Sequence, residues 1–161
     1  MKRIIVVLTF IFCAQFIEAK ELNVAIFYNQ YLSVNGQPYI ETYFSLDPTS
    51  VILTKDENKN WQGGIFILIT IEHEGLVVAY DKLKLNSTAT LDSNEILPYT
   101  IQQSRLKLDP GNYTMKIELA DQQKPDEPVT LEQEIAVDVN RDELNTSSIL
   151  LLDSYQEASA E

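Results

Sequence analysis

Cysteine and histidine are almost missing from this chain of 161 residues, which holds one of each. The cysteine, Cys13, lies in an apolar stretch near the N-terminus, so disulfide bonds, thiolate metal sites and a cysteine nucleophile are excluded from the remainder. The lone His73 cannot form a histidine metal cluster, and no G-x-S-x-G elbow accompanies it. Carboxylates are abundant, but no spacing singles out a glycosidase-like pair. We therefore expect no metal, no cofactor and no catalytic residue.

Positive charge is also scarce, because 12 Lys and Arg residues stand against 24 Asp and Glu and give a formal net charge of -12. A chain this acidic repels nucleic-acid phosphates and anionic lipid surfaces, so we expect neither as a partner. Hydrophobic residues make up 45%, which is enough for a packed core and too many for a disordered chain. The length suits one domain and a targeting segment.

The N-terminus has the parts of a Sec-type signal peptide. Its positive start, apolar run and small residue at the cleavage position are Lys2 and Arg3, Ile4–Ala14, and Ala19. The apolar run is shorter than the ~20 residues that a membrane helix needs. We predict a signal peptide over residues 1–19, export to the periplasm or the extracellular envelope, and no transmembrane span after cleavage. An uncleaved anchor or a buried first strand is the alternative.

Helical periodicity is missing from the rest of the chain, where apolar and polar residues alternate with a period of two between turn-rich segments. The expected strands are Leu22–Gln30, Tyr39–Leu46, Val51–Thr54, Trp61–Glu74, Leu76–Leu85, Ile101–Leu108, Tyr113–Leu119 and Val129–Val139. Since no helix separates these strands, antiparallel pairing is expected. The predicted fold is an all-β, antiparallel immunoglobulin/fibronectin-III-like β-sandwich of about eight strands over residues 20–140.

The alternation also assigns side chains to the core. Those expected inward are Ile40, Thr42, Phe44 and Leu46; Ile65, Ile67, Ile69 and Ile71; and Ile135 and Val137. Leu22, Val24, Ile26 and Tyr28 share one face of the first expected strand. Phe66 and Leu68 lie on the opposite face of the isoleucine strand, which predicts a central strand covered on both sides there. Gly63 and Gly64 indicate a bulge or a bend of the sheet.

The segment Leu108–Tyr113 has the pattern of a tyrosine corner. Pro110 and Gly111 stand at the centre of a tight turn, for which we expect a positive φ at Gly111. Tyr113 follows two residues later, where its ring can be buried while its hydroxyl bonds nearby backbone. We predict a structural role for Leu108, Pro110, Gly111 and Tyr113 rather than ligand binding.

Tyr39, Glu41 and Tyr43 share the outward face of the second expected strand, with Tyr28 and Tyr31 close in sequence. Tyrosines beside a carboxylate can anchor a protein interface, or stack on a sugar ring and bond its hydroxyls. They can also form a second hydrophobic layer under a neighbouring segment. We take Tyr39, Glu41 and Tyr43 as the candidate binding face, and all three interpretations stay open.

Asp56, Asn58 and Asn60 have the D-x-N-x-N spacing of a calcium loop. Trp61 stands where such a loop needs glycine, and Ile67 stands where it needs glutamate. We therefore predict that this polar stretch is a hairpin loop and holds no metal.

Five segments occur in an order that resembles the N-terminal region of secreted bacterial proteins named for a GWxTD motif. They are LNVAIFYNQY (Leu22–Tyr31), YIETYFSL (Tyr39–Leu46), YDKLKLNS (Tyr80–Ser87), LDPGNYTMKIELAD (Leu108–Asp121) and ILLLDSY (Ile149–Tyr155). The GWxTD motif is absent from the 161 residues, and in that family it lies in a later domain. The resemblance implies an exported N-terminal portion of a larger protein.

Residues 141–161 change in character, from a polar stretch through the apolar run Ile149–Leu152 to a small, acidic end. We expect either a terminal strand or a linker toward a missing downstream domain. For the whole chain, we predict a non-catalytic β-sandwich module of an exported bacterial envelope protein, acting as a spacer or a protein-docking domain. Its partner would be a downstream domain or an envelope protein. The alternative is a carbohydrate-binding module that uses the tyrosine-lined sheet face.

Overall fold

Residues 21–138 are described by the computed structural model, and most of them lie in antiparallel strands. The elements are β1 Val24–Leu32, β2 Pro38–Leu46, the 3-10 turn η1 Pro48–Ser50, β3 Thr54–Lys55, β4 Trp61–Gln62, β5 Gly64–His73, β6 Leu76–Asn86, β7 Thr100–Lys107, β8 Gly111–Asp121 and β9 Val129–Val137. The predicted signal peptide and the predicted terminal strand or linker, 141–161, fall outside this part of the chain. No helix within 21–138 is long and apolar enough to cross a membrane.

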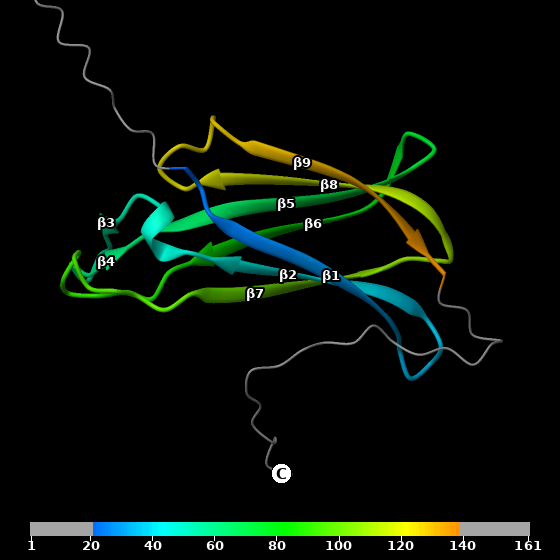
Figure 1. Ribbon diagram of the computed structural model, residues 1–161, viewed down its shortest axis with the longest axis horizontal. Coiled ribbons are helices and arrows are strands. Elements are labelled where there is room, and N and C mark those ends of the chain that lie inside the picture. Colours follow the sequence, from blue (N-terminus) through cyan, green and yellow to red (C-terminus); the bar gives the residue numbers. More distant parts are fainter. Residues whose placement is uncertain (1–20, 139–161) are drawn as a thin grey trace, which may run out of the picture.

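Two antiparallel sheets face each other (Figure 1). One sheet has the order β1-β2-β7, and the other has the order β6-β5-β8-β9. The short strands β3 and β4 form a hairpin at one end of the sandwich, at the left of Figure 1. This arrangement confirms the predicted immunoglobulin/fibronectin-III-like β-sandwich. It also places consecutive strands β1 and β2 in one layer and β5 and β6 in the other.

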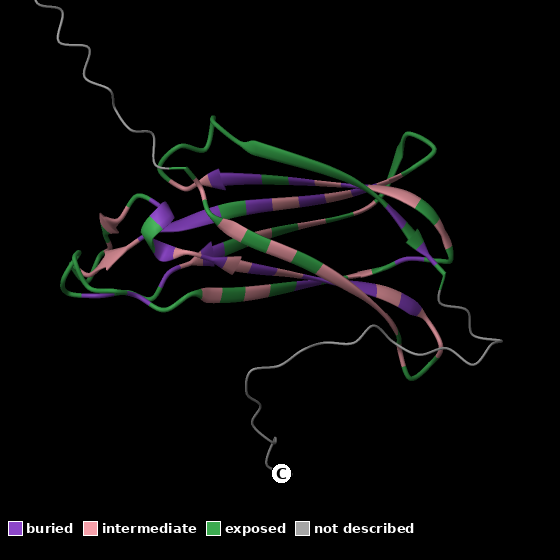
Figure 2. Ribbon diagram, viewed as in Figure 1, coloured by how far each residue is buried: buried purple, intermediate pink, exposed green. Residues whose placement is uncertain are grey.

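The core lies between the sheets, as the alternation predicts (Figure 2). The four isoleucines of β5 are at most 2% exposed, and Phe44 and Leu46 of β2 are fully buried. Such β-branched and aromatic side chains fit a pleated, buried surface. The expected cover over the other face of β5 is wrong at Phe66, which is 43% exposed, whereas Leu68 on that face is half-buried. The neighbours of Phe66 there are Lys84 of β6 and Ala120 of β8, which leave its ring open to water.

The segment before β5 departs from the expected strands. Val51 is buried directly after the 3-10 turn, and only Thr54–Lys55 of this region pairs as a strand. The long strand expected from Trp61 is divided at Gly63 into β4 and β5. A Cβ at Gly63 would lie 2.7 Å from Val51 Cγ2, so glycine permits the close approach of this preceding segment.

Tyr113, near the start of β8, returns its hydroxyl to the carbonyl of Asp109 at 2.8 Å. This is the contact that a tyrosine corner makes, and Leu108 beside it is buried. The expected positive φ at Gly111 is wrong, since Gly36 and Gly75 are the glycines with left-handed backbone in residues 21–138. Gly111 is the first residue of β8 and pairs with Val137, so it already has extended backbone. The tyrosine hydroxyl therefore holds the turn without a left-handed glycine.

Candidate functional site

The outward side chains of the three-stranded sheet form cross-strand rows. We call this surface the aromatic face, and its rows are Tyr31, Tyr39 and Lys107; Asn29, Glu41 and Arg105; and Phe27, Tyr43 and Gln103. The rows exist because β2 is the central strand, with β1 on one side and β7 on the other. Side chains directly opposite one another on neighbouring strands are close enough to interact.

Two stacked ring pairs join β1 to β2 on this face. Phe27 and Tyr43 have centroids 4.8 Å apart with planes only 9° from parallel. Tyr31 and Tyr39 are 5.5 Å apart at 27°. Each ring thus covers one face of its partner, which fixes the side chains before any ligand arrives. Phe27 remains 44% exposed, so the pairs still present apolar surface to water.

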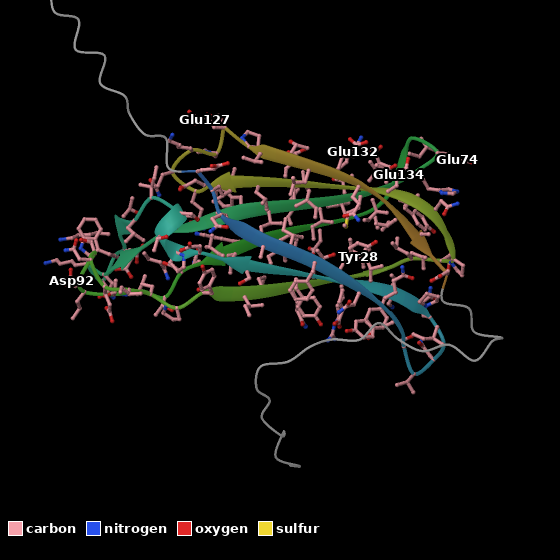
Figure 3. The ribbon with its side chains drawn as sticks, viewed as in Figure 1. Tyr28, Glu74, Asp92, Glu127, Glu132 and Glu134 are labelled. Atoms are coloured by element: carbon pink, nitrogen blue, oxygen red, sulfur yellow. The ribbon has the colours of Figure 1, made fainter. Side chains whose placement is uncertain are left out.

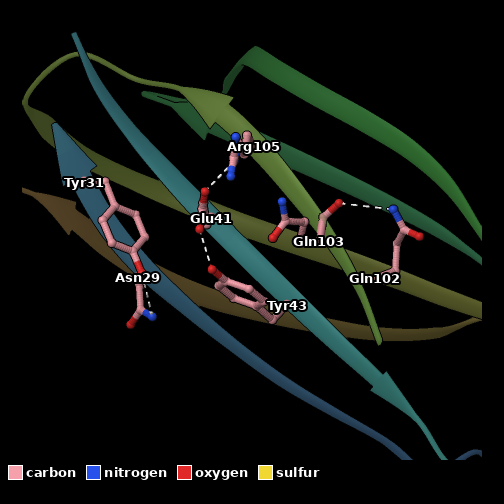
Figure 4. Close-up of polar contacts among 7 residues, drawn as sticks. All are labelled: Asn29, Tyr31, Glu41, Tyr43, Gln102, Gln103 and Arg105. Atoms are coloured by element: carbon pink, nitrogen blue, oxygen red, sulfur yellow. Dashed lines mark hydrogen bonds and ion pairs between the residues drawn. The ribbon is translucent and has the colours of Figure 1, made fainter. Parts of the chain in front are cut away.

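Glu41 is the polar centre of the aromatic face (Figure 4). The residue is only 5% exposed although it points away from the core. One carboxylate oxygen accepts a hydrogen bond from the Tyr43 hydroxyl, and the other forms an ion pair with Arg105. A buried charge needs such partners, because desolvation without them is costly. The face is therefore a connected unit rather than a set of independent surface residues.

The surroundings of Tyr43 change the pKa of its hydroxyl. Burial raises the pKa of its hydroxyl well above the usual value near 10, and the hydrogen bond to Glu41 raises the pKa further. The phenol therefore stays protonated and donates to the carboxylate throughout the neutral range. A second hydroxyl lies nearby, where Tyr31 accepts a hydrogen bond from the Asn29 amide at 3.3 Å.

The structure brings the sequence-selected residues Tyr39, Glu41 and Tyr43 to one side of β2, with Tyr31 beside them on β1. Tyr28 is turned the other way and packs against the core, in the space between β1 and β9 (Figure 3). Sequence reasoning missed Phe27, Asn29 and Arg105, which come from the neighbouring strands. Alternation alone puts these residues outward, but it does not say which strands are neighbours.

A shallow depression of about 350 Å³ borders the aromatic face at the Tyr39 end. It is lined by Ser33, Val34, Gln37, Tyr39, Arg105 and Lys107. Val34 is fully exposed at the tip of the β1–β2 turn, and Arg105 and Lys107 bring positive charge to an otherwise acidic protein. The depression thus adds the exposed Val34 to the aromatic face, beside Arg105 and Lys107 of that face.

Carboxylates gather on the other sheet around Glu72, Glu74 and Glu134, and Glu74 and Glu134 lie at the right of Figure 3, the end that also holds the β1–β2 turn. His73 contacts the Asn112 carbonyl there through Nδ1 at 2.8 Å. Within residues 21–138, no three His, Cys, Asp or Glu side chains are grouped so that they could hold a metal ion. The predicted hairpin loop lies between β3 and β4, where Asp56 accepts a hydrogen bond from the Asn60 amide at 2.8 Å.

The aromatic face therefore combines stacked rings, a shielded carboxylate and a bordering cationic depression. The resemblance to GWxTD-containing proteins stays a prediction. Comparison of the chain with protein-family models, curated proteins and solved structures finds no match.

Proposed function

We propose that this chain is a non-catalytic β-sandwich module of an exported bacterial envelope protein, and that the aromatic face docks a protein partner. The observation that carries the proposal is the burial of Glu41 among stacked tyrosines on the outside of a sheet. A side chain that points outward from a sheet is ordinarily exposed to solvent. Here the side chains are ordered as they would be at the centre of an interface.

Pre-ordering favours association. Binding costs free energy when side chains must be immobilised, and rings that are already stacked have lost that freedom. Tyrosine and arginine are also the residue types enriched among the side chains that dominate interface energies. Tyr39, Tyr43 and Arg105 are therefore the expected anchors, and Phe27 adds exposed apolar surface beside them.

The alternative ligand is a glycan. A sugar ring needs an open aromatic face, and hydroxyl recognition needs free polar atoms. In this sheet each stacked ring has one face taken, and the Glu41 carboxylate is already bonded to Tyr43 and Arg105. Both features suit a protein surface better than a sugar site. They also suit binding better than proton transfer, because Glu41 has no free oxygen aimed at a substrate.

Affinity capture from envelope extract tests the proposal. The wild-type chain, Tyr43→Ala and a control variant, Tyr80→Ala, are compared by quantitative mass spectrometry. Tyr80 is a 65% exposed tyrosine on the outer face of the other sheet, so it matches the chemistry but not the location. We expect a defined protein to be retained by the wild type and by Tyr80→Ala and to be lost with Tyr43→Ala. Equal capture by all three would contradict docking through this face.

A glycan array tests the alternative that the aromatic face binds a carbohydrate. Binding that Tyr43→Ala removes and Tyr80→Ala keeps would replace the protein partner by a carbohydrate. Circular dichroism of both variants checks that the sandwich is intact, so that a lost signal reports the surface and not the fold.

A further inference from the structure

The two sides of the sandwich are closed to different extents. On one side β6 and β7 lie together, and the Ser104 hydroxyl donates to Asp81 across the sheets at 2.5 Å. On the other side β1 and β9 run in the same direction (Figure 1) and are joined near their C-terminal ends. There the Gln30 side chain donates to the Ala136 carbonyl at 2.6 Å and accepts from the Asp138 amide at 3.3 Å.

An apolar groove of about 230 Å³ lies between β1 and β9. Its lining includes Ile26, Tyr28, Met115, Ile117 and Leu131. These side chains belong to the inner faces of the two sheets, as Figure 3 shows for Tyr28. The groove is thus mostly an opening onto the hydrophobic core, and Phe27, Glu132 and Gln133 complete its lining.

The inward face of β9 shows where this opening lies. Ile135 and Val137, next to the Gln30 bridge, are each 3% exposed. Val129 and Leu131 point to the same side of the same strand but are 50% and 47% exposed. Apolar residues on a core-facing strand are ordinarily covered, so about half of β9 is missing its neighbour.

Both borders of the groove are strand edges. β1 ends the three-stranded sheet and β9 ends the four-stranded sheet, and each is nine residues long. Long unprotected edges invite pairing with other chains, and proteins usually cover them. An extended segment placed in the groove would cover apolar side chains and satisfy backbone groups at the same time.

We propose that residues 149–152 of this chain occupy the groove as a further strand, antiparallel to β9. This segment lies beyond the described residues and reads Ile149, Leu150, Leu151 and Leu152, an apolar run that suits a strand covered on both faces. The described part ends at Asp138, beside the Gln30 bridge and therefore at one end of the groove. The ten residues in between are mostly polar and span up to about 33 Å, enough to turn and run back along β9.

Cysteine cross-linking in the full chain with Cys13→Ser tests the occupant. Leu131→Cys is combined in turn with a cysteine at each position from 149 to 152, and the pairs are oxidised. We expect a disulfide within one chain at alternate positions, because only one face of the strand meets Leu131. Phe66→Cys is the matched control, since Phe66 is as exposed as Leu131 but lies on the outer face of the same sheet.

The mass of the oxidised product distinguishes the possible occupants. A monomer cross-linked through Leu131→Cys and not through Phe66→Cys supports the proposal. A cross-linked dimer would mean that a second copy fills the groove, and this would overturn it. Equal cross-linking at all four positions, or none, would also overturn it.

A labelling experiment keeps the test independent of disulfide geometry. Leu150→Asp and Leu151→Asp together should disfavour burial of the segment, so maleimide should label Leu131→Cys faster in that background. Labelling of Phe66→Cys should stay unchanged, which shows that the sandwich remains folded. Unchanged labelling at Leu131→Cys would contradict the proposal.

Discussion

The outer faces of the two sheets each carry an acid–base pair, but they surround it differently. On the three-stranded sheet, Arg105 meets a Glu41 side chain that is 6% exposed and lies among stacked rings. On the four-stranded sheet, Lys116 meets Glu72 at 2.9 Å with side chains 35% and 22% exposed. In the first pair the carboxylate is shielded while the Arg105 side chain is 61% exposed, whereas in the second pair both side chains are partly exposed.

This difference in surroundings sets what each pair contributes. Exposed ion pairs contribute about 0 to 1 kcal/mol, because water and salt screen the attraction. Removing one partner of a shielded pair costs more, since the other charge stays desolvated without compensation. The aromatic face is therefore expected to be sensitive to single polar changes, whereas the opposite face should tolerate them. A surface that is sensitive in this way keeps a fixed shape for a partner.

The largest expected effect is that of Arg105→Met. This change keeps much of the apolar part of the side chain but removes the ion pair with Glu41. Of the two contacts described for the Glu41 carboxylate, the hydrogen bond from Tyr43 remains. We expect the free energy of unfolding to fall by about 2 kcal/mol. Urea denaturation measures the change, provided that the slope with denaturant is unchanged.

Glu41→Gln in the same background is the control. It removes the buried charge that Arg105→Met leaves without its cationic partner. The double variant should therefore recover much of the lost free energy of unfolding. If Arg105→Met has no effect on stability, Glu41 is hydrated in solution and the contrast between the faces fails.

Tyr113→Phe should have the next largest effect. It removes the hydroxyl that donates to the Asp109 carbonyl at 2.8 Å while keeping the partly buried ring. We expect a loss of about 1 kcal/mol in the free energy of unfolding, with partner capture by the aromatic face unchanged. Tyr99→Phe, at a 62% exposed position, is the matched control and should leave stability as it is. Lost capture in Tyr113→Phe would tie the corner to binding.

Sequence periodicity predicts the layers of this fold well, for a physical reason. In β2 and β5 strict alternation separates a buried face from an outer one, so Ile40, Phe44 and Ile67 could be assigned inward from the sequence. Phe66 was assigned wrongly because apolar character alone does not reveal whether another layer covers a sheet. Gly111 was assigned wrongly because the Tyr113 hydroxyl, and not a left-handed glycine, holds that turn.

Sequence periodicity predicted only part of the candidate site. Tyr39, Glu41 and Tyr43 lie on one strand, so alternation puts them on one face. Arg105 reaches that face because the order β1-β2-β7 pairs β2 with a strand that is distant in sequence, and Phe27 reaches it through the register of β2 with the preceding strand β1. Burial of Glu41 follows from these neighbours, and therefore no pattern within β2 could predict it.

Alkaline pH tests the surroundings of Tyr43 on the aromatic face, because its hydroxyl loses a proton in that range. Its folded-state pKa is raised by burial and by the hydrogen bond to Glu41, so the unfolded chain loses this proton first as the pH rises above about 10. The contribution of Tyr43 to stability is therefore complete below pH 10 and declines toward the raised pKa. Urea unfolding of the wild type between pH 8 and about 11 should show this decline.

Tyr43→Phe should weaken that decline, and Tyr80→Phe on the other outer face should not. Tyr113, whose pKa is also raised by burial and by the charge of Asp109, contributes to the slope that remains. Identical pH profiles for the wild type and Tyr43→Phe would mean that neither burial nor the hydrogen bond to Glu41 raises the pKa of Tyr43 in solution.

The smallest expected effect is that of Lys116→Met, the counterpart of Arg105→Met. Lys116 bonds Glu72 at 2.9 and 3.0 Å and lies 4.0 Å from Glu132, and its pKa is raised mainly by the hydrogen bond to Glu72. The carboxylate that loses its partner regains water, because the Glu72 side chain is already 22% exposed, against 6% for Glu41. We expect a small loss of stability that disappears in high salt, measured by urea denaturation at two ionic strengths. A loss of stability as large as that of Arg105→Met would mean that shielding of the carboxylate does not decide the strength of these ion pairs. That result would contradict the inference that the aromatic face is a pre-ordered surface.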